Sequence, residues 1–191
     1  MRNAAPSTCP LIWVTDSMWP VKIPRHVSIA LVILLAFSMQ SRPASARALP
    51  VSATADRVLV FKAKRKLLLL SGERVLKTYR ISLGGQPAGR KTMEGDRKTP
   101  EGKYVLDWHN PQSDFYKSIH ISYPNQADLA RAAKLGVPPG EDLFIHGQPN
   151  GHQGPAKQPG DWTDGCIAVS NAEMDEIWRA VPDGTPIEIK R

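Results

Sequence analysis

Two side chains in the last third of the chain could together carry out nucleophilic catalysis. His146 ends one short apolar run, and Cys166 lies between Gly165 and a second apolar run. A cysteine attacks as its thiolate, and a nearby imidazole is the usual group that generates the thiolate. The residue types therefore indicate a Cys–His pair brought together by an excursion of the chain. The alternative is a buried structural cysteine and an unrelated histidine, because free cysteines are often small buried apolar residues.

The N-terminus has the three parts of a secretory signal. Lys22 and Arg25 precede an apolar core at residues 29–39, and a small-x-small cleavage site follows at residues 44–46. The core is shorter than the roughly 20 residues that span a bilayer. We therefore predict a cleaved signal peptide over residues 1–46 and an exported protein of the periplasm or cell envelope. The alternative is an uncleaved membrane anchor.

Export changes the interpretation of the cysteines. The chain has two, Cys9 and Cys166, and cleavage after Ala46 removes the first. A single cysteine in an oxidising compartment is either an intermolecular link or a reactive thiol. This favours the catalytic interpretation of Cys166. Residues 1–17 fit poorly as a basic segment, so Met18 is a candidate for the true start.

The predicted mature chain is one domain and mildly basic. It has 145 residues, enough for a single hydrophobic core, with 21 basic and 17 acidic residues. It has no block of Lys and Arg interleaved with aromatic residues, which argues against nucleic-acid binding. We predict a short disordered lead at 47–56 and the catalytic domain at 57–191, with no stable membrane span after processing.

Alternating apolar residues and turn signals predict a mainly β fold with two short helices. Asn125 caps the first helix and Gly136 ends it, while Ser170 and Glu173 form a capping box for the second. Strands that pair in sequence order would give mostly antiparallel sheets, so a mixed β-sandwich or half-barrel is expected. The predicted strands cover residues 57–61, 64–71, 74–82, 104–108, 117–123, 143–146, 166–169 and 186–190.

This scaffold explains how the pair could meet. His146 ends one strand, Cys166 begins another, and the breaker-rich loop at 147–160 lets those strands lie side by side. The imidazole could then reach the thiol at hydrogen-bond distance, roughly 2.6–3.2 Å or longer in an empty site, and a resting thiolate–imidazolium pair is expected. Backbone amides at 163–166 would be oxyanion donors. Gly147 leaves room for a carbonyl that orients the imidazole, and no Asp or Asn is obviously placed as a third member.

The residues resemble the catalytic domain of the L,D-transpeptidase (YkuD) family. The resemblance rests on the His146-Gly147 pair, the TDGC segment at 163–166, Asn171 and the upstream segment EGDRKTPEGKY. It covers residues 57–190 and suggests a short exported member of the proteobacterial type. It implies the family's mixed β-sandwich, Cys166 as nucleophile, His146 as general base and acid, and no metal or organic cofactor.

The resemblance also implies a substrate. The Cys166 thiolate would attack a peptidoglycan stem peptide at the third residue and expel the terminal D-alanine. An amine from a second stem, or from an envelope lipoprotein, would resolve the thioester. Further site candidates are Gly165, Asp164 and Gly147 as oxyanion or orienting residues, and Trp162, Thr163 and Tyr123 as lining of the substrate cleft.

One departure and several alternatives remain. Family members commonly carry Arg two residues after the cysteine, where this chain has Ala168, and some short envelope relatives hydrolyse the bonds that others form. A metal site of His146, His152 and Cys166 is one alternative, since zinc accepts such ligands. A non-catalytic wall-binding module is another. The loop carrying His152 and the surface position of His120 argue against a catalytic role for either.

Overall fold

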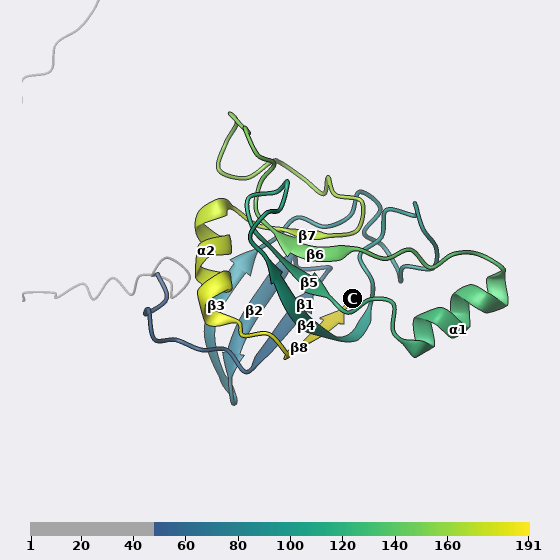
Figure 1. The fold of residues 1–191 in the computed structure, drawn as a ribbon, viewed down its shortest axis with the longest axis horizontal. Coiled ribbons are helices and arrows are strands. Elements are labelled where there is room, and N and C mark those ends of the chain that lie inside the picture. The colour runs from purple at the N-terminus through teal and green to yellow at the C-terminus, as the bar shows by residue number, and fades with distance from the viewer. Residues whose placement is uncertain (1–47) are drawn as a thin grey trace, which may run out of the picture. The chain divides into compact units, whose positions relative to one another are not determined.

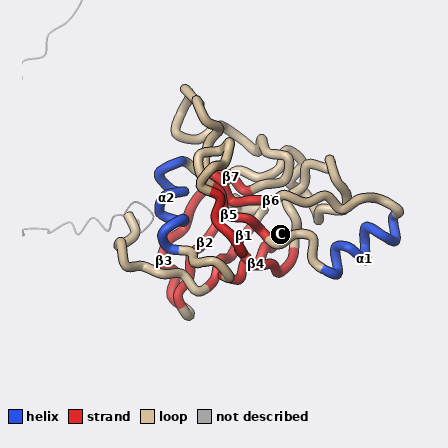
Figure 2. Tube along the Cα trace, in the orientation of Figure 1, coloured by secondary structure: helices blue, strands red, loops and turns tan. Residues whose placement is uncertain are grey.

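A computed structural model describes residues 48–191, which form eight strands and two helices (Figures 1 and 2). The predicted signal peptide and the candidate start at Met18 lie outside these residues. The strands are β1 (Arg57–Phe61), β2 (Lys66–Ser71), β3 (Arg74–Arg80), β4 (Gly102–Asn110), β5 (Ser118–Ile121), β6 (Leu143–His146), β7 (Ile167–Ala168) and β8 (Thr185–Lys190). The helices are α1 (Gln126–Leu135) and α2 (Asn171–Ala180). The prediction of a mainly β domain with two short helices is confirmed.

All the strands belong to one mixed sheet that curls on itself. The order is β3-β2-β1-β8-β4-β5-β6-β7. Ser82, two residues after β3, exchanges two backbone hydrogen bonds of 2.9 Å with Ala168 in β7, so the two edges of the sheet meet. Pairing in strict sequence order was the wrong expectation for β8, which lies between β1 and β4 and runs parallel to β1.

The core lies inside the curl of the sheet and under α2. Alternate side chains of the strands are fully buried, as in Val58 and Val60 of β1. Helix α2 adds Met174 and Ile177, the apolar face that its sequence predicts. The lead before β1 differs from the predicted disordered segment. Leu49 packs into the core, and the backbone N–H of Ala55 donates to Ala180 at 2.7 Å.

Both helices begin where their capping residues predict. The Asn125 side chain accepts from two amides in the first turn of α1, and Gly136 ends that helix at a φ of 66°. Leu129 of α1 is 41% exposed. The buried polar residue of α1 is instead Asp128, which accepts a hydrogen bond of 2.9 Å from the Tyr104 hydroxyl. Figure 1 shows α1 at the opposite end of the domain from α2.

Strands β6 and β7 bring the two reactive side chains together. They run parallel, with Ile145 opposite Ile167 and His146 opposite Ala168. The predicted strand at 166–169 is shorter than expected, because Cys166 lies just before β7. The two strands still lie side by side, as the long loop between them predicts. Within residues 48–191, no helix has both the length and the apolar character needed to cross a membrane.

Candidate active site

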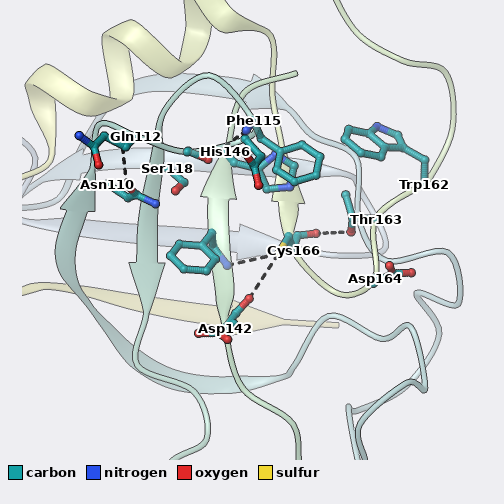
Figure 3. A pocket seen from close by; sticks show the side chains of 13 residues that line it. Asn110, Gln112, Phe115, Ser118, Asp142, His146, Trp162, Thr163, Asp164 and Cys166 are labelled. Carbon is teal, nitrogen blue, oxygen red and sulfur yellow. Dashed lines mark hydrogen bonds between the residues drawn. The ribbon is translucent and has the colours of Figure 1, made fainter. Parts of the chain in front are cut away.

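Cys166 and His146 line the same pocket, at the edge of the sheet where β6 and β7 meet (Figure 3). The pocket has a volume of about 380 Å³. Most of its polar lining groups are carboxylates, amides and hydroxyls. Its lining residues are Asn110, Gln112, Ser113, Asp114, Phe115, Ser118, Asp142, Phe144, His146, Trp162, Thr163, Asp164 and Cys166.

His146 is held as a neutral imidazole with one defined tautomer. Its Nδ1 donates to the Gly147 carbonyl at 2.7 Å, and a carbonyl can only accept. The Nε2 lone pair is therefore available as a base. The ring is 3% exposed and lies against Phe115 and Trp162, with centroid distances of 4.6 and 5.7 Å. Burial lowers the pKa of His146 to about 4.

The Cys166 thiol hydrogen-bonds to the backbone of the segment that leads into β6. Its Sγ accepts from the Phe144 amide at 3.4 Å and donates to the Asp142 carbonyl at 3.8 Å (Figure 3). Burial raises the pKa of the thiol to about 11, and the charges of Asp164 and Asp142 add to that shift. The structure therefore favours a neutral thiol beside a neutral imidazole.

This geometry corrects one expectation. The thiolate–imidazolium resting state is not favoured, because burial opposes both charges. Among the described residues, no hydrogen bond joins Sγ to the His146 ring, because the thiol uses the backbone of Phe144 and Asp142 instead. The pair therefore shares one pocket without a direct hydrogen bond.

The turn before Cys166 is held by its own side chains and by a distant arginine. Asp161 accepts from Nη2 and Nε of Arg65, at 2.7 and 3.1 Å, and from the Leu83 amide at 3.0 Å. The Thr163 hydroxyl donates to the Cys166 carbonyl at 2.7 Å and accepts from the Gly165 amide at 3.2 Å. These bonds fix the segment that carries the thiol and the Trp162 ring.

Gly165 is required by close packing of the backbone. Its φ is 134°, where side chains are rarely tolerated, and a Cβ would lie 2.9 Å from the Lys98 carbonyl oxygen. The turn at 163–166 therefore packs directly on the upstream loop. The Arg97 side chain also pairs with Asp164 across this contact, at 3.1 Å.

Asp96 shapes that upstream loop. Its carboxylate accepts from the amides of Thr92, Met93 and Lys98 and from the Lys91 ammonium. Burial alone would raise the pKa of Asp96, but these donors outweigh it and lower the pKa. Asp96 therefore holds the shape of this loop through backbone and side-chain donors.

Not every predicted site residue lies in the pocket. Trp162, Thr163 and Asp164 line it, whereas Gly147 and Gly165 act beside it through their backbones. The structure does not bring Tyr123 there, because its buried ring packs on Tyr104 and its hydroxyl donates to the Pro139 carbonyl at 3.0 Å. The predicted strand at 117–123 ends at Ile121, and the first residue of β5, Ser118, is the one that pairs with His146, so Tyr123 lies beyond the opposite end of β5.

The two other histidines considered also lie outside the pocket lining. His120 bonds Asp107 at 2.7 Å and stacks on Trp108, while Nε2 of His152 lies 2.9 Å from the Pro155 carbonyl within the long loop. Within residues 48–191, no three His, Cys, Asp or Glu side chains are grouped closely enough to hold a metal ion. His152 is therefore not joined to the Cys–His pair as a third ligand.

The sequence-based reasoning missed several lining residues. Phe144 could have been found, because it lies two positions before His146 on the same face of β6. Phe115 and Asp142 come from irregular segments without a recognisable motif. Asp142 adopts a φ of 57°, and its carbonyl accepts from the thiol.

The fold and the site together define the class of protein, a curled β domain with a cysteine and a histidine in one pocket. The sequence pattern of the L,D-transpeptidase catalytic domain (YkuD) family matches residues 55–189, and the chain belongs to that family. It is 32% identical over 130 residues to YafK of Escherichia coli (strain K12), a protein whose own L,D-transpeptidase assignment is provisional. That match covers 65% of this chain and 46% of YafK, so the chain spans about half of the curated relative's length.

Solved structures show the same domain. The helical cell shape determining protein Pgp2 of Campylobacter jejuni, as its K307A mutant, matches with a TM-score of 0.56 and 25% identity, over 75% of this chain and 50% of Pgp2. Bd1075 of Bdellovibrio bacteriovorus matches with a TM-score of 0.50 and 25% identity, over 78% of this chain and 52% of Bd1075. These similarities confirm the expected fold type.

Proposed function

We propose that this protein is an exported L,D-transpeptidase that acts on peptidoglycan stem peptides through a Cys166 thioester. The observation that carries the proposal is the shared pocket, in which His146 keeps its Nε2 lone pair available beside Cys166. Family membership supports peptidoglycan as the substrate. An envelope lipoprotein is a second possible acceptor in place of another stem peptide.

The first half-reaction begins with two neutral groups. As the donor peptide enters, the thiol turns from the Asp142 carbonyl toward His146, and Nε2 takes the thiol proton as sulfur attacks the acyl carbon. Such a concerted transfer avoids a free ion pair, which burial disfavours at both residues. The imidazolium then gives its proton to the departing D-alanine amine, leaving a thioester on Cys166.

The developing oxyanion needs backbone donors. In the turn at 163–166, the Thr163 amide already donates to Leu83 and the Gly165 amide to the Thr163 hydroxyl. The amides of Asp164 and Cys166 carry no such bond within the described residues. We assign these two amides to the acyl oxygen, because fixed N–H groups stabilise the charge that forms there.

The second half-reaction selects the product. His146 removes a proton from the acceptor amine, which attacks the thioester and forms the cross-link while Cys166 recovers its proton. Water in place of the amine would give hydrolysis by the same chemistry. Both outcomes share the acyl-enzyme, so they differ only in the nucleophile that the pocket admits.

The test uses purified tetrapeptide muropeptides with the chain from Arg47 and with its Cys166→Ala variant. The protein's intact mass and the soluble products are followed together. The transpeptidase predicts a Cys166-dependent adduct, released D-alanine and cross-linked dimers. Shortened peptides without dimers would replace the proposal with hydrolysis. Absence of both adduct and product, with Cys166 freely alkylated, would overturn it.

A further inference from the structure

One peptide unit beside His146 is held at both of its ends. Its carbonyl, from Gly147, accepts the His146 Nδ1 hydrogen bond of 2.7 Å. Its N–H, from Gln148, donates to Oδ1 of Asn171 at 2.8 Å. A trans peptide is planar, and its C=O and N–H point in opposite directions. Asn171 and the imidazole therefore form hydrogen bonds to opposite sides of one planar peptide unit.

We infer that Asn171 is a positioning residue for His146 and acts through this peptide unit. Rotation of the 147–148 plane would break the Asn171 bond and turn the carbonyl away from Nδ1 at the same time. The Gly147 carbonyl thus orients the imidazole directly, and Asn171 holds the peptide unit that carries this carbonyl. Its catalytic consequence rests on the proposed function, whereas its effect on the imidazole does not.

The surroundings leave little freedom for another arrangement. A Cβ on Gly147 would lie 2.6 Å from Asn171 Oδ1 and 3.0 Å from Cβ of Tyr116, so only glycine allows this approach. The Gly147 amide donates to the carbonyls of Phe115 and Lys117, at 3.1 and 3.2 Å. The backbone is therefore bonded on the other side of Gly147 as well.

The Gln148 side chain fixes the residue that supplies the N–H. It is 3% exposed, and its Nε2 donates to the Val169 carbonyl at 2.6 Å. Its Oε1 accepts from the Gln158 amide at 2.9 Å, which ties the long loop to the same point. Val169 in turn donates its amide to the His146 carbonyl at 3.0 Å. Hydrogen bonds therefore connect the imidazole, the 147–148 peptide unit and the start of α2.

Asn171 presents its oxygen from a rigid base. It is the first residue of α2, and the capping box of Ser170 and Glu173 holds that helix start without the Asn171 side chain. A substitution at Asn171 should therefore remove the acceptor but keep the helix. This separation makes the inference testable, because a purely structural role would show itself as a loss of the helix start.

The test compares Asn171→Ala, which loses the acceptor, with Asn171→Asp, which retains it. Asn125→Ala is the matched control, because Asn125 also accepts backbone amides at the start of a helix but lies at α1, outside the pocket lining. The first measurement is the tautomer of His146 by ¹⁵N NMR of histidine-labelled protein, with the resonance assigned by a His146→Gln variant. The second measurement is kcat and KM on muropeptides. Thermal unfolding then shows whether each variant keeps its fold.

The expected result is one Nδ1–H tautomer in the wild type, in Asn171→Asp and in Asn125→Ala, and a mixture of tautomers in Asn171→Ala. The kcat of Asn171→Ala should fall roughly tenfold, the scale of one lost hydrogen bond, with KM unchanged. An unmixed tautomer in Asn171→Ala would overturn the inference, as would a mixture that also appears in Asn125→Ala. If the wild type turns over no stem peptide, the proposed function fails while the tautomer comparison still decides the role of Asn171.

Discussion

The protonation state of the resting thiol can be tested by the pH dependence of its alkylation. With a Cys166 pKa of about 11, only about one molecule in 10,000 is a thiolate at pH 7. Alkylation by iodoacetamide should then rise about tenfold with each pH unit from about pH 6 to about pH 10, since only the thiolate reacts. A resting ion pair would instead give a nearly constant rate above roughly pH 5, because its thiolate is already formed.

The slope decides this question better than the absolute rate. A thiolate of high pKa is intrinsically more nucleophilic, with a Brønsted coefficient of about 0.4–0.5. Over about six units of pKa this restores a factor of several hundred, so the two states differ in rate at pH 7 by only about one order of magnitude. The alkylation rate of a neutral thiol rises tenfold per pH unit, whereas that of a resting ion pair hardly changes with pH.

The assay measures the intact mass of the protein after timed exposure, with His146→Gln as the control. In the neutral state, removing the imidazole leaves the slope unchanged. A flat wild-type profile that becomes steep in His146→Gln would refute the reasoning, because it would show that His146 holds the thiolate before substrate arrives.

Three further predictions follow from the site. The pKa of His146 is about 4 in the folded protein and about 6.5 ordinarily, so the free energy of unfolding should fall by about 3 kcal/mol as the pH drops from about 6.5 to about 4. Urea unfolding should show this fall in the wild type but not in His146→Gln. Gly165→Ala should lose about 1–3 kcal/mol of unfolding free energy and most acylation, since its Cβ meets the Lys98 carbonyl at a φ of 134°; unchanged thermal unfolding would contradict this. Asp161→Asn should lower the free energy of unfolding by about 1–2 kcal/mol, because it weakens the bonds to Arg65, and should slow acylation by loosening Trp162. A variant with the acylation rate and stability of the wild type would exclude that role.

The sequence was sufficient to predict the meeting of Cys166 and His146. His146 ends β6, Cys166 directly precedes β7, and the two strands lie side by side. Because β7 has only two residues and Ala168 lies opposite His146, Cys166 still lies beside β6, where the Phe144 amide donates to its Sγ. The helix starts at Asn125 and Ser170 were equally accessible, because capping is local chemistry. Local patterns of this kind depend on residues only a few positions apart.

The rest depends on contacts that no local pattern contains. The alternation of β8 is the same whichever strands it pairs with, so its place between β1 and β4 could not be read from it. The bond between Asn171 and Gln148 spans 23 positions and exists only because the fold brings the start of α2 beside the residues that follow β6. The charge state of Cys166 was predicted from residue types alone, but burial decides it, and burial is a property of the folded chain.

The neutral pair suits the compartment that the signal sequence predicts. An exported protein works in an oxidising environment, where a thiolate is the form of cysteine that is oxidised. Cys166 is a free cysteine within the described residues, so a resting thiolate there would be exposed to the same oxidants that form disulfides elsewhere. A thiol bonded to the Phe144 amide and the Asp142 carbonyl avoids that reaction. Under the proposed function, activation depends on the arriving acyl group, because His146 takes the thiol proton as the sulfur attacks the acyl carbon. Low reactivity toward general electrophiles is therefore compatible with the proposed acyl transfer, because His146 is oriented in advance and would be ionised only during the reaction.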